Sequence, residues 1–397
     1  MTNTLQQCIS KIRLGAAGAA LTFVVVLAIG VVTTPSAQAQ TFTDLYNFTD
    51  GADGGYPYAG LVRDAAGNLY GTTFRGGSSS AGVVFEVSKT GTETVLYNFT
   101  GGADGGYPYA GLLRDTDGTL YGTTSHGGAS GFGTVFELST AGTETVLYSF
   151  AGGTSDGCNP YGGLVQNKAG SLYGTTVRCG SNNQGTVFKL TKGGKETVLH
   201  SFVGSDGAFP YYTSLLMDAK GNLYGVTEEG GTTFQGVVYK LSKKGTLTVL
   251  YSFAGGTTDG CYAYGTPVMD KQDNLYGTTN ACGTSGDGNV WKVSSKGKET
   301  VLHNFAGGSS DGAGPNAGVI FDEKGNLYGD TGVGGASGVG TVYELNKKGT
   351  LTLLHSFSTS DGSYLYGGVI RSASGTLYGT TLEGGSGGFG TVWKVKP

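Results

Sequence analysis

Short hydrophobic segments alternate with glycine clusters along the chain, and the region 109–150 shows the pattern most clearly. There, β-branched and aromatic residues gather at 109–115, 119–124, 133–139 and 144–150. The connection 115–118 (Asp-Thr-Asp-Gly) is typical of a tight hairpin, because glycine readily adopts the positive φ that such turns require. No window shows a sustained 3.6-residue period, which excludes stacked-helix architectures. The pattern predicts four short antiparallel strands in about fifty residues.

This unit is repeated seven times. The string Leu-Tyr-Gly recurs at intervals of 50 to 52 residues, with its tyrosine at Tyr70, Tyr121, Tyr173, Tyr224, Tyr276, Tyr328 and Tyr378. Four antiparallel strands in such a period form the blade of a β-propeller. The sequence therefore predicts an all-β, seven-bladed propeller.

The two ends of the repeated region are complementary. Residues 42–48 match the fourth strand of the first copy, 93–99, residue for residue from Leu45 onward, whereas the seventh copy ends with its third strand at 390–395. An open array would leave unpaired strand edges, which a closed propeller avoids. We expect residues 42–48 to complete the seventh blade and close the ring.

Each copy carries a set of short motifs, which in the first period are Gly-Asn-Leu-Tyr-Gly-Thr-Thr (67–73), Gly-Gly (76–77), Gly-Val-Val-Phe (82–85), Thr-Val-Leu-Tyr (94–97) and Asp-Gly (104–105). With these motifs the chain resembles the Gloeo/Verruco tandem repeat of exported bacterial proteins, from about residue 42 to the end. This resemblance implies export, but no shared reaction or catalytic residue. Members of that family have varied surface-anchoring tails, and we expect none in this protein.

Residues 1–39 read as a secretory signal peptide. Lys11 and Arg13 precede an apolar run from Leu14 to Val32, and Ala37-Gln38-Ala39 provides a small-x-small cleavage site. An uncleaved membrane anchor is the alternative. Cleavage would leave residues 40–397 as the propeller, with no further long apolar run to span a membrane. We expect it outside the cytoplasm, in the periplasm, at the cell surface or secreted.

Composition narrows the class of protein. The chain has 76 Gly among 397 residues but only 8 Pro, which excludes collagen, and its 24 Tyr and 18 Phe exclude a disordered glycine-rich tract. Without residues 1–39, 23 basic and 29 acidic residues give a net charge of −6. Such a chain has no electrostatic attraction for nucleic acid or anionic lipid. We expect a monomer without a cofactor.

Four of the five cysteines occur in two pairs with the same spacing. Cys158 and Cys261 each follow an Asp-Gly, and Cys179 and Cys282 lie 21 residues later, where other copies have glycine. In an exported chain, cysteines that occur together in some repeats and are absent from the others indicate disulfides 158–179 and 261–282. A shared metal site is the less favoured alternative, because the pairs lie in non-adjacent blades.

Repeated polar residues favour structure over catalysis. An Asp precedes Gly in every copy, and a ring of seven equivalent groups is typical of turns, in which the carboxylate accepts backbone N–H bonds. Calcium binding or a charged rim is the alternative. His200, His303 and His355 replace a fourth-strand Tyr, so they occupy a packing position, and no arrangement typical of a catalytic triad or a phosphate loop occurs.

Two sets of residues on the Asp-Gly face are candidates for ligand binding. The first is a ring of tyrosines that could stack on sugars or simply pack between blades. The second is a variable position before the Gly-Gly pair. Its side chains could form a binding site, or they could be ordinary solvated residues of exposed loops. The candidates are Tyr58, Tyr109, Tyr161, Tyr211, Tyr264 and Tyr366 in the first set, and Arg75, His126, Arg178, Glu229 and Glu383 in the second.

These features support three hypotheses. The first is an exported, non-enzymatic propeller that binds a glycan or a protein through its loop face. The second is an extracellular glycan hydrolase or lyase, for which Glu229, Glu383 and His126 are the differentiated acid-base candidates. The third is a purely structural component of the cell envelope.

Overall fold

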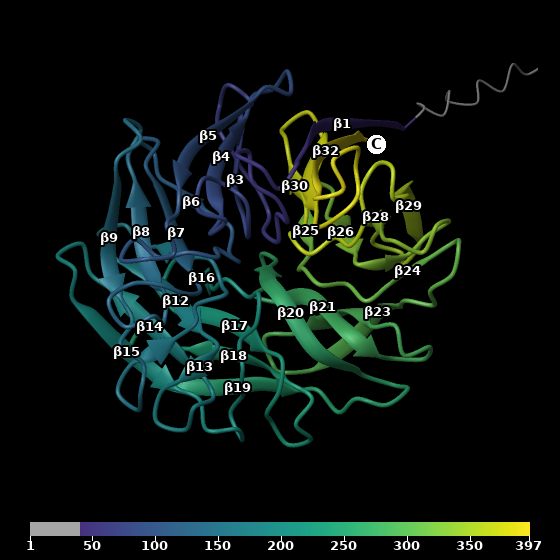
Figure 1. Ribbon diagram of the computed structural model, residues 1–397. Helices are drawn as coiled ribbons and strands as arrows, with labels where there is room; N and C mark the ends of the chain where they lie inside the picture. The colour runs from purple at the N-terminus through teal and green to yellow at the C-terminus, as the bar shows by residue number, and fades with distance from the viewer. Residues whose placement is uncertain (1–39) are drawn as a thin grey trace, which may run out of the picture. The chain divides into compact units, whose positions relative to one another are not determined.

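The computed structural model describes residues 40–397, which form a seven-bladed β-propeller with four antiparallel strands per blade (Figure 1). No helix occurs among these residues. The predicted signal peptide and its cleavage site fall outside the described residues, so they stay predictions.

The strands of blades 1 to 4 are β2 (Val62–Arg63), β3 (Leu69–Thr73), β4 (Val83–Val87) and β5 (Glu93–Asn98); β6 (Leu113–Arg114), β7 (Leu120–Thr124), β8 (Thr134–Leu138) and β9 (Glu144–Ser149); β11 (Val165–Gln166), β12 (Leu172–Thr176), β14 (Thr186–Leu190) and β15 (Glu196–Ser201); and β16 (Leu216–Met217), β17 (Leu223–Thr227), β18 (Val237–Leu241) and β19 (Leu247–Ser252).

The strands of blades 5 to 7 are β20 (Gly260–Met269), β21 (Leu275–Cys282), β22 (Asn289–Val293) and β23 (Glu299–Asn304); β25 (Ile320–Phe321), β26 (Leu327–Thr331), β28 (Thr341–Leu345) and β29 (Leu351–Ser356); and β30 (Ile370–Arg371), β31 (Leu377–Thr381), β32 (Thr391–Lys396) and β1 (Thr41–Asn47). Two small ladders lie in the loops and pair β10 (Gly157–Cys158) with β13 (Arg178–Cys179), and β24 (Gly312–Ala313) with β27 (Val333–Gly334).

Most first strands are shorter than the sequence predicts. In blade 2 only Leu113 and Arg114 pair as a strand, so the predicted extent of 109–115 is wrong. The preceding residues line the axis of the propeller, where segments of all seven blades converge. Their carbonyl groups accept hydrogen bonds from side chains of the neighbouring blade instead, as the Ala110 carbonyl does from Thr72 Oγ1 at 3.1 Å. Blade 5 is the exception, with the ten-residue β20.

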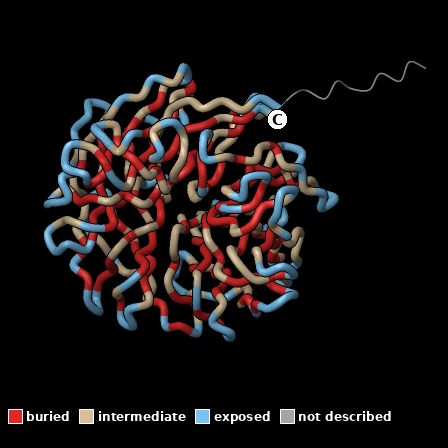
Figure 2. Tube along the Cα trace, turned by 45° about the vertical axis from the view of Figure 1, so that its right-hand side comes forward, coloured by how far each residue is buried: buried red, intermediate tan, exposed pale blue. Residues whose placement is uncertain are grey.

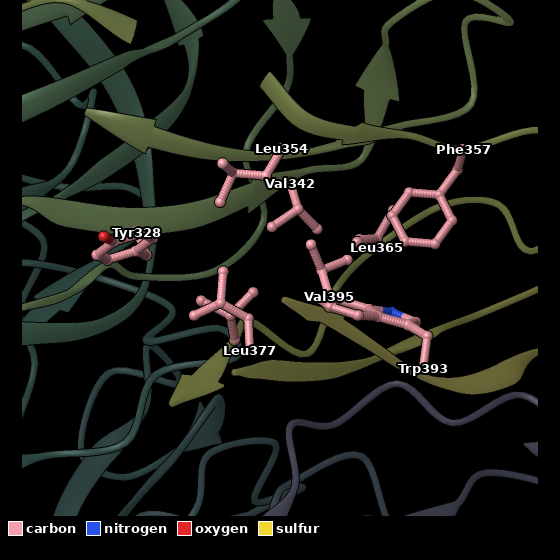
Figure 3. Close-up of a cluster of buried hydrophobic side chains, with 9 residues drawn as sticks. Tyr328, Val342, Leu354, Phe357, Leu365, Leu377, Trp393 and Val395 are labelled. Atoms are coloured by element: carbon pink, nitrogen blue, oxygen red, sulfur yellow. The ribbon is translucent and has the colours of Figure 1, made fainter. Parts of the chain in front are cut away.

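The glycine of Leu-Tyr-Gly is explained by packing within the blade. A Cβ atom built on Gly71 would lie 2.6 Å from the Phe85 ring, and one on Gly379 would lie 2.4 Å from the Trp393 indole. Glycine in the second strand therefore lets a large aromatic ring of the third strand lie flat across it. The ring in turn fills the core between two blades, as Trp393 does with Phe357 and Leu365 (Figure 3). Buried residues follow the strands, and exposed residues are confined mostly to the loops (Figure 2).

Hydrogen bonds near the axis join successive blades. Second-strand threonines donate to main-chain carbonyls of the next blade, and the bond from Thr380 Oγ1 to the Ala59 carbonyl, 2.9 Å long, joins blade 7 to blade 1. β1 pairs with β32, with Phe42 opposite Val395 and Asn47 opposite Thr391. The first described strand is therefore the outermost strand of blade 7. That the ring depends on this strand for its closure remains a prediction.

Candidate functional site

The propeller has two chemically different ends. We call the end with the loops between second and third strands, together with the blade-to-blade connections, the loop face, and the opposite end the hairpin face. Of the six large hydrophobic side chains that are exposed in the described chain, five lie on the loop face, and Phe234 is 67% exposed. These five are Phe132, Val203, Phe234, Val333 and Tyr364. Exposed apolar groups gathered on one face are typical of binding surfaces.

Seven tyrosines meet at the axis on the loop face. We call Tyr58, Tyr109, Tyr161, Tyr211, Tyr212, Tyr264 and Tyr366 the tyrosine cluster. Tyr212 occupies its centre, because its ring lies between 5.5 and 6.5 Å from the rings of all six others. Tyr109 also packs at 4.8 Å against Tyr58 and at 4.4 Å against Tyr161. The structure thus brings all six predicted tyrosines together.

A cavity of about 340 Å³ lies along the axis next to the tyrosine cluster. Its walls are mostly small and aliphatic residues that precede the first strands, such as Gly60, Ala110 and Val319, and five cluster tyrosines also line it. The cavity has few polar side chains to fix a ligand. A ligand would therefore find its polar partners at the mouth, among the tyrosines and the residues around them.

The phenol groups of the cluster are largely free to bind a ligand. Tyr264 donates a hydrogen bond of 2.6 Å from its hydroxyl to Glu228 Oε1. Tyr58, Tyr109 and Tyr161 are partly buried, and their hydroxyl groups form no hydrogen bond with another described residue. Burial of the rings raises the pKa of all three above the usual value for tyrosine. They therefore remain neutral hydrogen-bond donors at physiological pH.

Sequence reasoning missed Tyr212 as the central residue. Counting back from the first-strand pair Leu216 and Tyr224 places Tyr212 where Tyr58 stands in blade 1, and Tyr211 is an inserted residue. The signal was present in the sequence, because copy 4 has one more residue between Phe209 and the following leucine than the other copies have. Tyr211 nevertheless packs 5.4 Å from Tyr161 and belongs to the cluster.

The variable position lies beside the outer aromatic residues of the loop face. The backbone of each residue at this position pairs antiparallel with the start of the blade-to-blade connection, as Arg75 does with Gly55 and His126 with Gly106. The Arg75 guanidinium carbon lies 5.6 Å from the centre of the Phe74 ring. Arg178 lies 5.5 Å from the Phe209 ring in the same way, and both arginines are exposed.

Glu228, next to the variable position, is the most enclosed acid of the mouth. Burial raises the pKa of its carboxyl, as does neighbouring Glu229, whereas the hydrogen bond from Tyr264 and the charge of Arg178 oppose this. Glu229 is exposed, and Glu383 lies close enough to raise the pKa of Tyr366. Acidic groups therefore occupy the mouth on blades 4 and 7.

The outer aromatic residue of each loop has an unusual backbone. Tyr56, Tyr107, Phe209, Tyr262 and Tyr364 all have φ between 52° and 59°, in the left-handed region. Blades 3 and 6 place Asn159 and Gly314 there, residues that tolerate this conformation better. Non-glycine residues in such regions cost of the order of 1 kcal/mol or more, and they concentrate at functional sites. Five blades thus retain an aromatic ring where a less strained residue would fit.

The repeated aspartates are structural, as predicted. In every blade the Asp of Asp-Gly accepts a backbone N–H bond and a side-chain bond from a fourth-strand Tyr or His. The Tyr97 hydroxyl donates to Asp104 at 3.0 Å, and His200 Nε2 lies 2.9 Å from Asp206. His200, His303 and His355 are therefore equivalents of tyrosine in this clasp rather than ligands of one ion.

Both predicted disulfides are present on the loop face. Cys158 is joined to Cys179, and Cys261 to Cys282, each with a sequence separation of 21 residues. The first bridge ties β10 to β13, next to Arg178. By the loop-entropy estimate such a bridge stabilises the fold by about 3 kcal/mol.

The carboxyl groups around these clasps predict how stability depends on pH. Burial and a neighbouring aspartate raise the pKa of Glu93, Glu144, Glu196 and Glu299 to about 7. Because each of these carboxyl groups keeps its proton more readily in the folded chain, its contribution to stability is fully present below about pH 4.5, the pKa in the unfolded chain. This contribution is lost as the pH rises through about 7, the pKa in the folded chain. We expect the free energy of unfolding from urea titrations to fall between about pH 5 and pH 8. It should fall less steeply in Glu144→Leu, which copies Leu247 of blade 4. A stability that increases over this range would contradict the prediction.

Comparison with known proteins gives one family and several distant structures. The Gloeobacter/Verrucomicrobia repeat model matches residues 28–167, 153–320 and 211–397. The extracellular domain of a protein described as a one-component system of B. thetaiotaomicron is 10% identical with a TM-score of 0.57. The match covers 89% of this chain but 40% of that domain. No curated protein is significantly similar in sequence.

A gluconolactonase from Xanthomonas campestris is 14% identical over 90% of this chain and 89% of its own, with a TM-score of 0.44.

Among residues 40–397, no helix is long and apolar enough to cross a membrane.

Proposed function

Because the chain belongs to the Gloeobacter/Verrucomicrobia repeat family and folds as a propeller, we propose that it is an exported protein that binds a glycan through its loop face. The tyrosine cluster carries this proposal: seven aromatic rings lie together at the mouth of the axis, and most of their hydroxyl groups have no partner among the described residues. Aromatic faces stack on sugar rings, and phenol groups exchange hydrogen bonds with sugar hydroxyls.

Two further observations support a ligand on this face. Exposed large hydrophobic side chains are concentrated there, and aromatic residues are retained at left-handed backbone positions. Two disulfides also tie loops of the same face, which suits a chain that works outside the cytoplasm. The structural relatives fit this setting, because one of them is an extracellular domain.

Loss of a ring from the tyrosine cluster should weaken glycan binding. We expect Tyr161→Ala to reduce affinity at least tenfold, because aromatic anchors at the centre of a site contribute most of the binding energy. Tyr161→Phe should retain most of the affinity if stacking dominates. The measurement is a glycan array followed by titration calorimetry with residues 40–397.

Tyr121→Ala is the matched control, because this tyrosine lies near the hairpin face, where its hydroxyl donates to Asp115. It should bind as the parent does. If no glycan on the array binds and cross-linking on the cell surface captures a protein that depends on the tyrosine cluster, the ligand is a protein and not a glycan. Absence of any ligand that depends on the cluster would favour a structural envelope component.

An extracellular glycan hydrolase or lyase is the second candidate, and Glu228 is the observation that favours it. This carboxyl is half-buried at the mouth, has a raised pKa and receives a hydrogen bond from Tyr264. A general acid needs such a raised pKa. Shorter products in a mixture of protein and bound oligosaccharide, absent with Glu228→Gln, would establish turnover.

A further inference from the structure

Positive charge on the loop face is confined to one arc. Among the described residues, the lysines and the other arginines lie in strands or in turns of the hairpin face. The loop face carries Arg75 on blade 1 and Arg178 on blade 3, with His126 between them on blade 2. Three successive blades thus place a cationic or titratable group at the same position, around Tyr58, Tyr109 and Tyr161. We call Arg75, His126 and Arg178 the basic arc.

The guanidinium groups of the arc are available to an anion. Neither Arg75 nor Arg178 forms an ion pair with any described carboxylate, whereas Arg371 on the hairpin face is paired with Glu323 at 3.1 Å. The nearby Asp-Gly carboxylates are already engaged, as Asp104 is with Tyr97. The arginines therefore retain the donor fork that recognises carboxylates.

The hydrogen bonds around His126 show which of its ring nitrogens carries the proton. Its Nδ1 lies 2.8 Å from Ser125 Oγ, and that hydroxyl also lies 2.7 Å from the Tyr107 carbonyl oxygen, to which it donates its single proton. Nδ1 therefore carries the ring proton, and Nε2 is the acceptor. Burial lowers the pKa of His126, so the neutral ring is the form present at neutral pH. Between the two arginines, the arc offers an acceptor suited to a sugar hydroxyl.

From this arrangement we infer that the loop face is selective for an acidic saccharide, an oligosaccharide containing uronate. Its pyranose rings lie on Tyr109 and Tyr161, and its carboxylates bind Arg75 and Arg178. Glu228 and Glu229 on blade 4 and Glu383 on blade 7 flank the two ends of the arc and repel the same carboxylates, so the ligand lies across blades 1 to 3. This inference rests on the proposed glycan binding and adds the charge of the ligand.

The test compares acidic and neutral forms of the same sugars. A panel of galacturonate, glucuronate and mannuronate oligosaccharides is titrated into residues 40–397, each beside its methyl ester, which keeps the rings but removes the charge. We expect at least one acid to bind, its ester to bind about tenfold more weakly, and added salt to weaken the acid alone. Arg75→Gln and Arg178→Gln should each weaken the acid about tenfold without affecting the ester.

Arg114→Gln is the matched control, because this guanidinium also lies over a tyrosine ring, 5.5 Å from Tyr70, but on the hairpin face. It should leave the affinity for both the acid and the ester unchanged. Neutral sugars that bind as well as the acids, with no effect of either arginine, would overturn the inference while glycan binding stands. Binding of no saccharide, acidic or neutral, would overturn both.

Discussion

Removal of residues 40–48 should destabilise the propeller by more than about 5 kcal/mol, as the sum of several lost interactions in blade 7. Phe48 is completely buried and packs at 5.0 Å against Phe85 of blade 1, and loss of such a ring alone costs about 3–5 kcal/mol. On the other side, Phe42 stacks 3.9 Å from His355 of blade 6. The strand thus contacts both neighbours of its own blade, and its loss would also expose the edge of β32.

The measurement compares chains that begin at Gln40 and at Thr49 by urea denaturation and by size-exclusion chromatography. We expect the shorter chain to unfold at lower urea and to associate through the open edge. A synthetic peptide of residues 40–48 should restore stability, and the same peptide with Phe48→Ala should not. Phe48→Ala in the longer chain covers the case in which the short chain fails to fold. Equal stability of the two chains would show that the ring does not need this strand.

The number and order of the blades follow from sequence alone because the repeat is governed by short-range physics. Gly71 and its equivalents must lie under an aromatic ring, and the loop aspartates must clasp the neighbouring outer strand. Both requirements recur with the period of the blade, so they are visible as a pattern. The extent of the first strands was not predictable, since it is set by crowding of seven segments at the axis.

Residues of the outer strands vary together between successive blades. The first position is the fourth-strand Tyr or His that binds the aspartate of Asp-Gly, and the second is the residue near the start of the fourth strand in the next blade. Where the first position is Tyr, the second is Glu, and where the first is His, the second is Leu or Phe. A tyrosine hydroxyl can donate to the aspartate and accept from a protonated carboxyl, whereas the imidazole N–H that donates has no lone pair left. The pairs, with the earlier blade first, are Tyr46–Glu93, Tyr97–Glu144, Tyr148–Glu196, His200–Leu247, Tyr251–Glu299, His303–Leu351 and His355–Phe42.

The candidate site was only partly predictable. The tyrosines and the variable position were found because they occur at fixed places in each copy, but the central place of Tyr212 depends on one inserted residue. Likewise, sequence gives the identities of Arg75 and Arg178, whereas their lack of carboxylate partners depends on contacts between blades. Side-chain pairing across the ring is a property of the closed structure.

Asp330→Thr should stabilise the protein by about 4 kcal/mol at pH 8 and by much less at pH 4. Asp330 lies in β26, is fully buried, and neither of its carboxyl oxygens has a well-formed hydrogen bond among the described residues. Five other blades have threonine at this position, and its hydroxyl donates to a carbonyl of the next blade, as Thr278 does to Ala317 at 2.6 Å. A threonine side chain here would restore that bond to blade 7.

The pH dependence follows from the carboxyl itself. Burial raises the pKa of Asp330 from 3.8 to about 7, and the nearby backbone amides of Asp330 and Gly368 oppose this only in part. Below pH 4 the group is protonated in both the folded and the unfolded chain, so it costs little. Between pH 4 and pH 7 the unfolded chain loses its proton first, and about three pKa units correspond to about 4 kcal/mol of lost stability.

Urea denaturation of the parent, Asp330→Thr and Asp330→Asn at pH 4 and pH 8 separates the charge from the lost hydrogen bond. Asn imitates the protonated carboxyl, so the stability difference between Asp330→Asn and Asp330→Thr should not depend on pH. Asp330→Asn should still be less stable than Asp330→Thr, because it lacks the hydrogen bond of the threonine hydroxyl. The matched control is Val226→Thr at the equivalent position of blade 4, which adds a hydroxyl without removing a charge, so its effect should be independent of pH. A difference between parent and Asp330→Thr that stays constant from pH 4 to pH 8 would mean that the carboxyl is solvated or paired in the folded chain.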